Sequence, residues 1–128
     1  MTEKKFTITN RTKSAIPKIP WLKIKEASLG KAYDLSLVFI GEKDSQKLNF
    51  SYRKKNKPTN ILSFTLNKTK GEIFITPKIV RQETAKFGRT FSNLLAFLFI
   101  HGIMHLKGME HGSRMNKAEE MLRNKFGI

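Results

Sequence analysis

The stretch SNLLAFLFIHGIMHLKG, residues 92–108, is apolar on nearly all sides of the helix that it predicts. Ser92 can cap the start of this helix, and Gly108 can end it in a left-handed conformation. A helix without a polar face has to be covered by the rest of the protein. The stretch therefore predicts a buried central helix around which the other elements pack.

The segments on either side show strand and helix patterns. Short apolar runs between polar turns predict strands over residues 4–8, 33–40, 61–66 and 71–75. The last two strands are joined by the polar turn NKTK, which predicts a hairpin. Helical patterns cover residues 20–30, 44–52, 77–88 and 113–127.

Two of these helices carry further expectations. In the helix over residues 44–52, Asp44 is expected to be the N-cap, with Leu48 and Tyr52 on one face. In the C-terminal helix, one apolar stripe consists of Met115, Ala118, Leu122 and Phe126. Together the patterns predict an α+β fold, with a small mixed four-stranded sheet packed against about five helices in a single domain over residues 1–128.

The composition is that of a basic globular protein. Among 128 residues, Lys and Arg number 25 and Asp and Glu number 10, which gives a net charge of +15. This charge attracts polyanions, but it does not separate RNA, DNA and anionic membranes, and an ordinary lysine-rich surface would give the same count. There is no cysteine, which excludes disulfides and cysteine-ligated zinc. Because the longest apolar run, residues 94–100, is short, we expect a soluble, cytoplasmic protein with no membrane partner.

All 3 histidines of the chain fall within HGIMHLKGMEH, residues 101–111. His101 and His105 are four residues apart, so they project from the same face of the predicted helix. If the helix ends at Gly108, the chain can turn back and bring His111 to the same point. Three imidazole nitrogens with an open fourth position are typical of a catalytic zinc site on a zincin-like helix, where the ion can polarise a phosphoryl oxygen. The alternative is a set of hydrogen-bonded core histidines.

The histidine spacing overlaps the H-E-x-x-H-x-x-G-x-x-H signature of metzincin peptidases. Those enzymes have a glutamate directly after the first histidine as general base, whereas this sequence has Gly102. The nearest acidic residue is Glu110, which could orient a histidine or accept a proton, or could face solvent. Residues 53–57, RKKNK, supply four positive charges, which favours a phosphodiester substrate.

The motif HGIMHLKGMEH resembles the H-G-x-x-H-L-x-G-y-D-H signature of the YbeY endoribonucleases, the rRNA maturation factors. Three further segments resemble the same family: YRKKNKPTNILSF at residues 52–64, GEIFI at residues 71–75 and MNKAEEMLRNKFGI at residues 115–128. The sequence departs from the family pattern at Glu110, where the family has aspartate, at Met109, where it has an aromatic residue, and at Thr65, where it often has proline.

The resemblance implies a metal-dependent endoribonuclease that cleaves single-stranded RNA. Its role would be rRNA maturation, at the 3′ end of 16S rRNA, and ribosome quality control. The resemblance also implies one zinc ion held by His101, His105 and His111. The partners would be single-stranded rRNA, the small ribosomal subunit, and a ribosomal protein or an Era-type GTPase.

Other side chains are candidates for the reaction. By resemblance, Arg53 would hold the scissile phosphate or its transition state, unless it is only a basic residue on the path of the RNA. Glu110 is the second candidate catalytic residue. Phe64 is expected in the core rather than as a platform for a base. The candidate substrate-binding residues are Lys54, Lys55, Lys57, Thr59, Asn60 and Ser63.

Two alternatives to the ribonuclease stay open. The first is a metallopeptidase-like hydrolase, against which Gly102 argues because it supplies no base. The second is a ribosome assembly factor without catalysis of its own, in which the metal is structural. In that case, replacing a histidine would lower the melting temperature and would remove no turnover.

Overall fold

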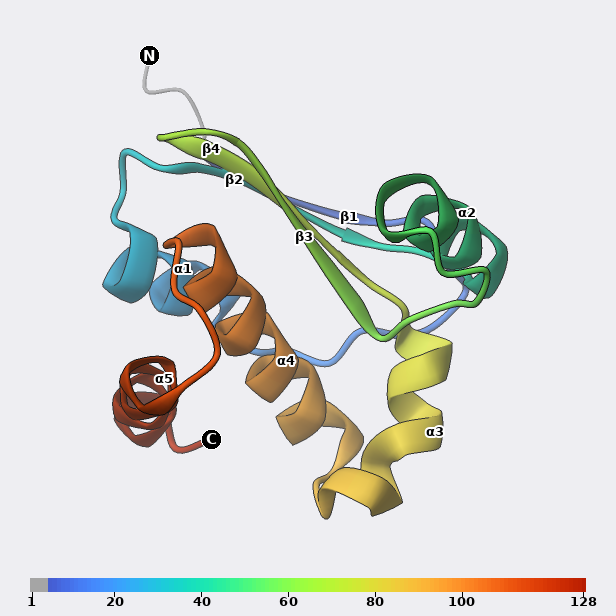
Figure 1. Ribbon diagram of the computed structural model, residues 1–128. Coiled ribbons are helices and arrows are strands. Elements are labelled where there is room, and N and C mark those ends of the chain that lie inside the picture. Colours follow the sequence, from blue (N-terminus) through green and yellow to red (C-terminus); the bar gives the residue numbers. More distant parts are fainter. Residues whose placement is uncertain (1–4) are drawn as a thin grey trace.

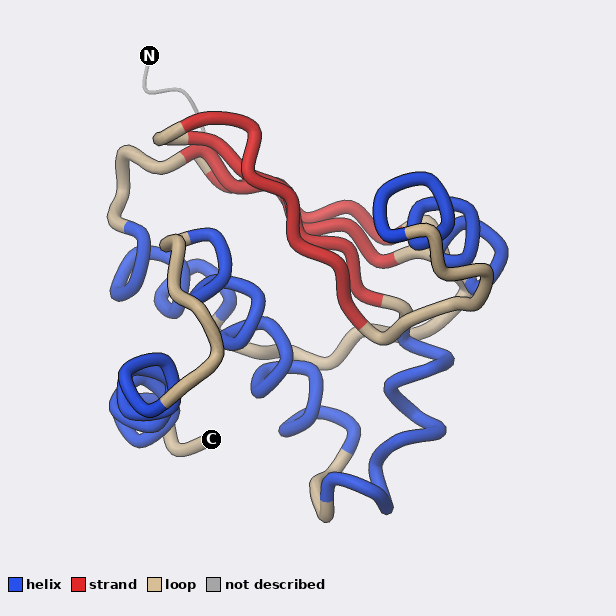
Figure 2. The backbone as a smooth tube through the Cα atoms, in the orientation of Figure 1, coloured by secondary structure: helices blue, strands red, loops and turns tan. Residues whose placement is uncertain are grey.

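The computed structural model describes residues 5–128, in which strands and helices are mixed before three consecutive helices end the chain (Figures 1 and 2). The strands are β1 (Phe6–Asn10), β2 (Asp34–Phe39), β3 (Ile61–Asn67) and β4 (Lys70–Ile75). The helices are α1 (Trp21–Leu29), α2 (Glu42–Arg53), α3 (Pro77–Phe87), α4 (Phe91–Leu106) and α5 (Ser113–Phe126). Within the described residues, the predicted α+β class with four strands and five helices is confirmed.

The four strands form one mixed sheet in the order β1-β2-β4-β3. β2 pairs in parallel with both β1 and β4, while β3 and β4 form the predicted antiparallel hairpin. The predicted first strand, residues 4–8, was placed too early, because the pairing with β2 begins at Phe6 and continues to Asn10. Residue 4 lies outside the described residues. The order leaves β3 as an edge strand.

The sheet has an inner face, which we define as the face toward α4, and an outer face. On the inner face, Leu35, Leu37 and Phe39 of β2 are fully buried, as are Ile73 and Ile75 of β4. Facing them, α4 contributes the fully buried residues Leu94, Leu95, Phe99, Ile100 and Ile103. The predicted buried central helix is therefore confirmed. Figure 1 shows α1, α4 and α5 on this side of the sheet, with α2 beyond the other side at one end.

The start of α4 differs from the expectation. Thr90, rather than Ser92, is the N-cap: its side-chain oxygen accepts a hydrogen bond from the backbone N–H of Asn93 at 3.1 Å. Thr90 has extended backbone angles, as an N-cap residue requires, whereas Ser92 already lies inside the helix. The helix therefore begins at Phe91, whose side chain is partly buried against the core.

Helix α2 also differs from the expectation. It begins at Glu42 with Gly41 as the N-cap residue, so Asp44 lies in the first turn, where a negative charge favours the helix dipole. Its buried residues are Ser45 and Asn49, while the side chain of Tyr52 is 66% exposed. The face that α2 buries is therefore polar, which an apolar pattern could not indicate.

The described residues contain no single helix that is long and apolar enough to cross a membrane. Within residues 5–128, one pair of helices, Pro77–Phe87 and Phe91–Leu106, meets the length and composition criteria together, and it is bent by 101° at its break.

Candidate metal centre

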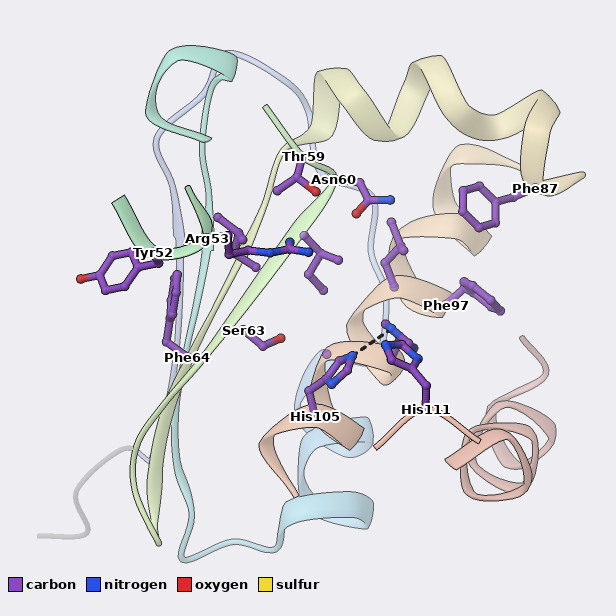
Figure 3. Close-up of a pocket in the computed structure, with 15 residues that line it drawn as sticks. Tyr52, Arg53, Thr59, Asn60, Ser63, Phe64, Phe87, Phe97, His105 and His111 are labelled. Carbon is purple, nitrogen blue, oxygen red and sulfur yellow. Dashed lines mark hydrogen bonds between the residues drawn. The ribbon is translucent and has the colours of Figure 1, made fainter. Parts of the chain in front are cut away.

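The structure brings the three histidines together. His101 and His105 project from the last turns of α4, and His111 comes from the loop that follows. One ring nitrogen of each lies within 4.8 Å of the other two, and the Nε2 atoms of His101 and His105 are 3.1 Å apart. Figure 3 shows His105 and His111 turned toward the same point at the floor of a cleft.

The turn after α4 explains why His111 returns to the helix. Gly108 has a φ of 81°, in the left-handed region that glycine adopts without a steric penalty. Its N–H donates to the carbonyl of His105 at 2.9 Å, and the N–H of Met109 donates to the carbonyl of Met104 at 3.1 Å. These two bonds form a Schellman motif, which reverses the chain at the end of a helix. The predicted end of the helix at Gly108 is confirmed.

A carboxylate from α5 supports the first histidine. Glu119 is only 6% exposed, and its Oε1 accepts a hydrogen bond from Nδ1 of His101 at 2.5 Å. Arg123 lies 3.7 Å from the other oxygen of Glu119. Because a carboxylate accepts hydrogen bonds, this contact favours the tautomer of His101 with its ring proton on Nδ1. The unprotonated Nε2 then faces the other two histidines. A carboxylate in this position typically orients a metal-binding imidazole and raises its basicity.

The donor set fits a divalent metal ion. Zinc–nitrogen bonds of about 2.0–2.1 Å in a tetrahedral site place the ligand nitrogens about 3.4 Å apart. The 3.1 Å between the Nε2 atoms of His101 and His105 agrees with this spacing, and His111 lies within reach. The pKa of His105 is lowered by burial and further by His101, His111 and Arg53, against an opposing effect of Glu119. His105 is therefore neutral at pH 7, which is the form that binds a metal.

The histidines lie in a cleft of about 820 Å³ between β3, the end of α2 and helix α4 (Figure 3). Four of the predicted site residues line this cleft with the histidines, namely Arg53, Thr59, Asn60 and Ser63. Lys54, Lys55 and Lys57 are exposed in the loop after α2 and do not line it. Glu110 is exposed after α4 and also does not line it, so its proposed role stays a prediction.

Polar side chains of α2 hold the loop that carries Thr59. The Ser45 hydroxyl donates to the carbonyl of Thr59 at 3.0 Å and accepts from the N–H of Thr59 at 2.9 Å. Asn49 donates to the carbonyl of Lys57 at 2.8 Å. Because Arg53 is the last residue of α2, the same contacts fix the helix end from which its side chain extends into the cleft (Figure 3).

Gly102 lies where α4 packs directly on β3. A Cβ atom at this position would be 2.8 Å from the hydroxyl oxygen of Ser63 and 2.9 Å from Cδ1 of Ile61. Both distances are well below ordinary van der Waals contact, so even alanine would require the side chains of Ser63 and Ile61 to move. As these side chains pack here, the position that carries the general base in peptidases has no room for a glutamate side chain.

Glu119 is not among the site residues predicted from the sequence. A usable signal was present, because Glu119 falls beside the apolar stripe of α5 and is buried with Met115 and Leu122. An acidic residue on the buried face of a helix is rare unless it has a partner. The partner, His101, comes from another helix and could not be identified from spacing.

We expect Glu119→Gln to weaken metal binding by about 10- to 100-fold, because a neutral amide orients and polarises His101 less than a carboxylate does. The measurement is a competition titration of the metal ion against a chromophoric chelator. Glu120→Gln is the matched control, since Glu120 is exposed on the same helix. Equal affinities of the two variants would mean that Glu119 does not support the centre.

Comparisons with known proteins agree on one family. The family model described as Endoribonuclease YbeY matches residues 1–127. A protein named Endoribonuclease YbeY from Bdellovibrio bacteriovorus is 34% identical over 97 residues, covering 74% of this chain and 62% of its own length. One of the same name from Buchnera aphidicola is 36% identical over 100 residues, covering 72% and 64%. In both cases the aligned part spans slightly less than two thirds of the relative.

A solved structure has the same fold. The solution structure of a protein from Thermotoga maritima superposes with a TM-score of 0.66 and 25% sequence identity, covering 95% of this chain and 89% of that one. The match of the family model over nearly the whole chain agrees with the resemblance that the histidine motif indicated. This chain belongs to the endoribonuclease YbeY family.

Proposed function

We propose that this protein is a metal-dependent endoribonuclease that cleaves single-stranded RNA, with residues 1–128 acting as one unit. One observation carries the proposal: three imidazole nitrogens converge within 4.8 Å in a cleft that Arg53 also lines. Metal ligands beside a fixed cation suit a phosphodiester, because charge develops on the phosphate oxygens during cleavage. Membership of the YbeY family supports the same reaction.

The residues that would hold the metal are His101, His105 and His111, and we propose zinc because all three ligands are neutral nitrogens. When bound, the ion supplies Lewis-acid polarisation of a phosphoryl oxygen and lowers the pKa of water. Glu119 keeps His101 in the tautomer that presents Nε2. Glu110 remains a second candidate catalytic residue; it is exposed and directly precedes His111 in the chain.

The other side chains of the cleft would hold the RNA. We assign Arg53 to the scissile phosphate, because its guanidinium is a rigid fork of donors that matches two phosphate oxygens. Thr59, Asn60 and Ser63 can form hydrogen bonds with sugar or base atoms from the same wall. The exposed Lys54, Lys55 and Lys57 would extend the attraction for phosphates beyond the cleft.

We place this activity in ribosome biogenesis. The proposed substrate is rRNA, cleaved at the 3′ end of 16S rRNA, with a further role in ribosome quality control in the cytoplasm. The small ribosomal subunit, and a ribosomal protein or an Era-type GTPase, are the proposed partners. The net charge of +15 supports a ribonucleoprotein partner, since phosphate neutralisation releases condensed counterions.

The two alternatives make different predictions. A peptidase needs a base near the first histidine, and the packing of Gly102 against Ser63 and Ile61 leaves no room for one there. An assembly factor with a structural metal needs the ion for folding only. Metal removal would then lower its melting temperature without affecting any turnover.

The test is cleavage of a labelled single-stranded RNA by purified protein, by chelator-treated protein and by the same sample refilled with zinc. We expect cleavage to be lost on chelation and restored by zinc, and expect a duplex of the same sequence to be resistant. A single-stranded DNA arm distinguishes attack by the 2′-hydroxyl of RNA from attack by water, because DNA lacks the 2′-hydroxyl and would stay uncut in the first case. Cleavage that persists unchanged after complete metal removal would overturn the proposal.

A further inference from the structure

Strand β3 separates two surfaces next to the metal centre. Ile61 and Ser63 face α4, because a Cβ atom at Gly102 would lie within 2.9 Å of both side chains. Side chains alternate along a strand, so Leu62 and Phe64 face the outer side of the sheet. β3 is an edge strand, so within the described part of the chain no further strand of this sheet lies beyond it.

An aromatic cluster, which we define as Tyr52, Phe64 and Phe74, lies on the outer face beside this edge. The ring centroids of Tyr52 and Phe64 are 4.6 Å apart, and those of Phe64 and Phe74 are 5.8 Å apart. Phe64 and Phe74 are half-buried, while Tyr52 is 66% exposed. The prediction that Phe64 belongs to the core is therefore wrong. Its strand lies at the edge of the sheet, and its ring packs against the exposed ring of Tyr52 instead.

The aromatic cluster is continuous with the metal cleft. Tyr52 and Phe64 line the same cleft as His105 and His111, although they lie on the other side of β3 (Figure 3). Arg53 follows Tyr52 in the chain and extends between the two groups. A polymer whose phosphate lies at Arg53 therefore has a neighbouring nucleotide within reach of the rings.

The charges beside the cluster match a single-stranded nucleic acid. Residues 53–57 follow Tyr52 directly, and their four cations are all exposed. On β4, next to the aromatic cluster, the half-buried Glu72 is paired with Phe64 across the hairpin. Phosphates would avoid Glu72 and follow residues 53–57, which leaves the base over the rings. A carboxylate in this position can also accept a hydrogen bond from a base amino group.

We infer that single-stranded RNA crosses β3 and stacks one unpaired base on the aromatic cluster, at a subsite on the other side of β3 from the histidines. This inference rests on the proposed function, whose substrate it extends. Rings presented by a sheet, with cations alongside to follow the backbone, are the general means by which proteins hold unpaired bases. Stacking requires an unpaired base, so the subsite would also contribute to selection against duplex RNA.

The test compares RNA affinity between variants by fluorescence anisotropy, with cleavage measured on gels from the same samples. We expect Tyr52→Ala to weaken binding of a labelled single-stranded RNA about tenfold, within the range for loss of one stacked base. Tyr52→Phe, which keeps the ring, should recover most of that loss. The matched control is Phe50→Ala, because Phe50 is 52% exposed on the same helix and is not part of the cluster.

A second arm uses RNA with a single abasic nucleotide moved along the strand. When the abasic nucleotide occupies the position of the stacked base, wild-type protein should bind this RNA about tenfold more weakly than intact RNA. The Tyr52→Ala variant should bind the abasic and the intact RNA with equal affinity. Equal affinities of Tyr52→Ala and Phe50→Ala would overturn the inference, and if cleavage persisted the proposed function would still stand. If the affinities follow the expected pattern but no sample cleaves RNA, the inference is supported and the proposed function is overturned.

Discussion

Replacing His105 by alanine is expected to abolish metal binding and RNA cleavage together. His105 is half-buried among the three histidines, and its Nε2 lies 3.1 Å from the Nε2 of His101. Its loss leaves two imidazoles, one of which is on an exposed loop. We expect the loss of activity to exceed the roughly 100-fold that removal of a supporting residue costs, because a ligand itself is removed. The measurements are metal content and cleavage of a labelled single-stranded RNA.

The control is wild-type protein prepared side by side, since a contaminating ribonuclease would cleave equally in both samples. Melting temperatures of His105→Ala and of metal-free wild type separate loss of the ion from loss of the fold. If His105→Ala melts at lower temperature but cleaves at the wild-type rate, the metal is structural and the assembly-factor alternative gains support. Cleavage lost while metal binding is retained would also contradict the role of His105 as a ligand.

Replacing Arg53 by alanine is expected to lower kcat by about 100- to 1000-fold with little change in metal content. Arg53 lines the cleft with the histidines. The pKa of His105 is lowered mainly by burial, and the positive charge of Arg53 adds to that lowering. Removing one such group, which stabilises developing negative charge, typically costs this much in kcat. Single-turnover cleavage at saturating protein measures the effect on the chemical step.

Two variants make the Arg53 result specific. Arg53→Lys should recover only part of the rate, because an ammonium group is a point charge and cannot form two parallel hydrogen bonds. Lys55→Ala removes a neighbouring exposed cation outside the cleft, so it should weaken RNA affinity several-fold and reduce its salt dependence. Equal losses of kcat for Lys55→Ala and Arg53→Ala would mean that Arg53 acts only through general attraction of RNA.

Features that depend on neighbouring residues could be predicted from the sequence. The apolar run 92–108 indicated α4, Gly108 indicated the turn, and both are present. The hairpin of β3 and β4 and the stripe of α5 were also evident, because turn residues and periodicity are local signals. These elements together bring His101, His105 and His111 to one point.

Features that depend on distant contacts could not be predicted. The buried face of α2 is polar because Ser45 and Asn49 bind the backbone of a loop, and no hydrophobic pattern indicates such a face. Phe64 was expected in the core rather than as a platform for a base, but its strand lies at an edge. Glu119 gains its partner only when α5 packs on α4.

The close contact of Gly102 with β3 has a consequence for how enzyme classes diverge. This chain and the metzincin peptidases share the spacing of histidines and glycine, which suggests that one substitution could exchange their chemistries. The contact distances of 2.8 and 2.9 Å obstruct that route, because a glutamate at Gly102 would first require the side chains of Ser63 and Ile61 to move aside. The barrier between the two activities therefore lies in the side-chain packing between α4 and β3, and a laboratory attempt to convert one into the other should begin with Ile61 and Ser63.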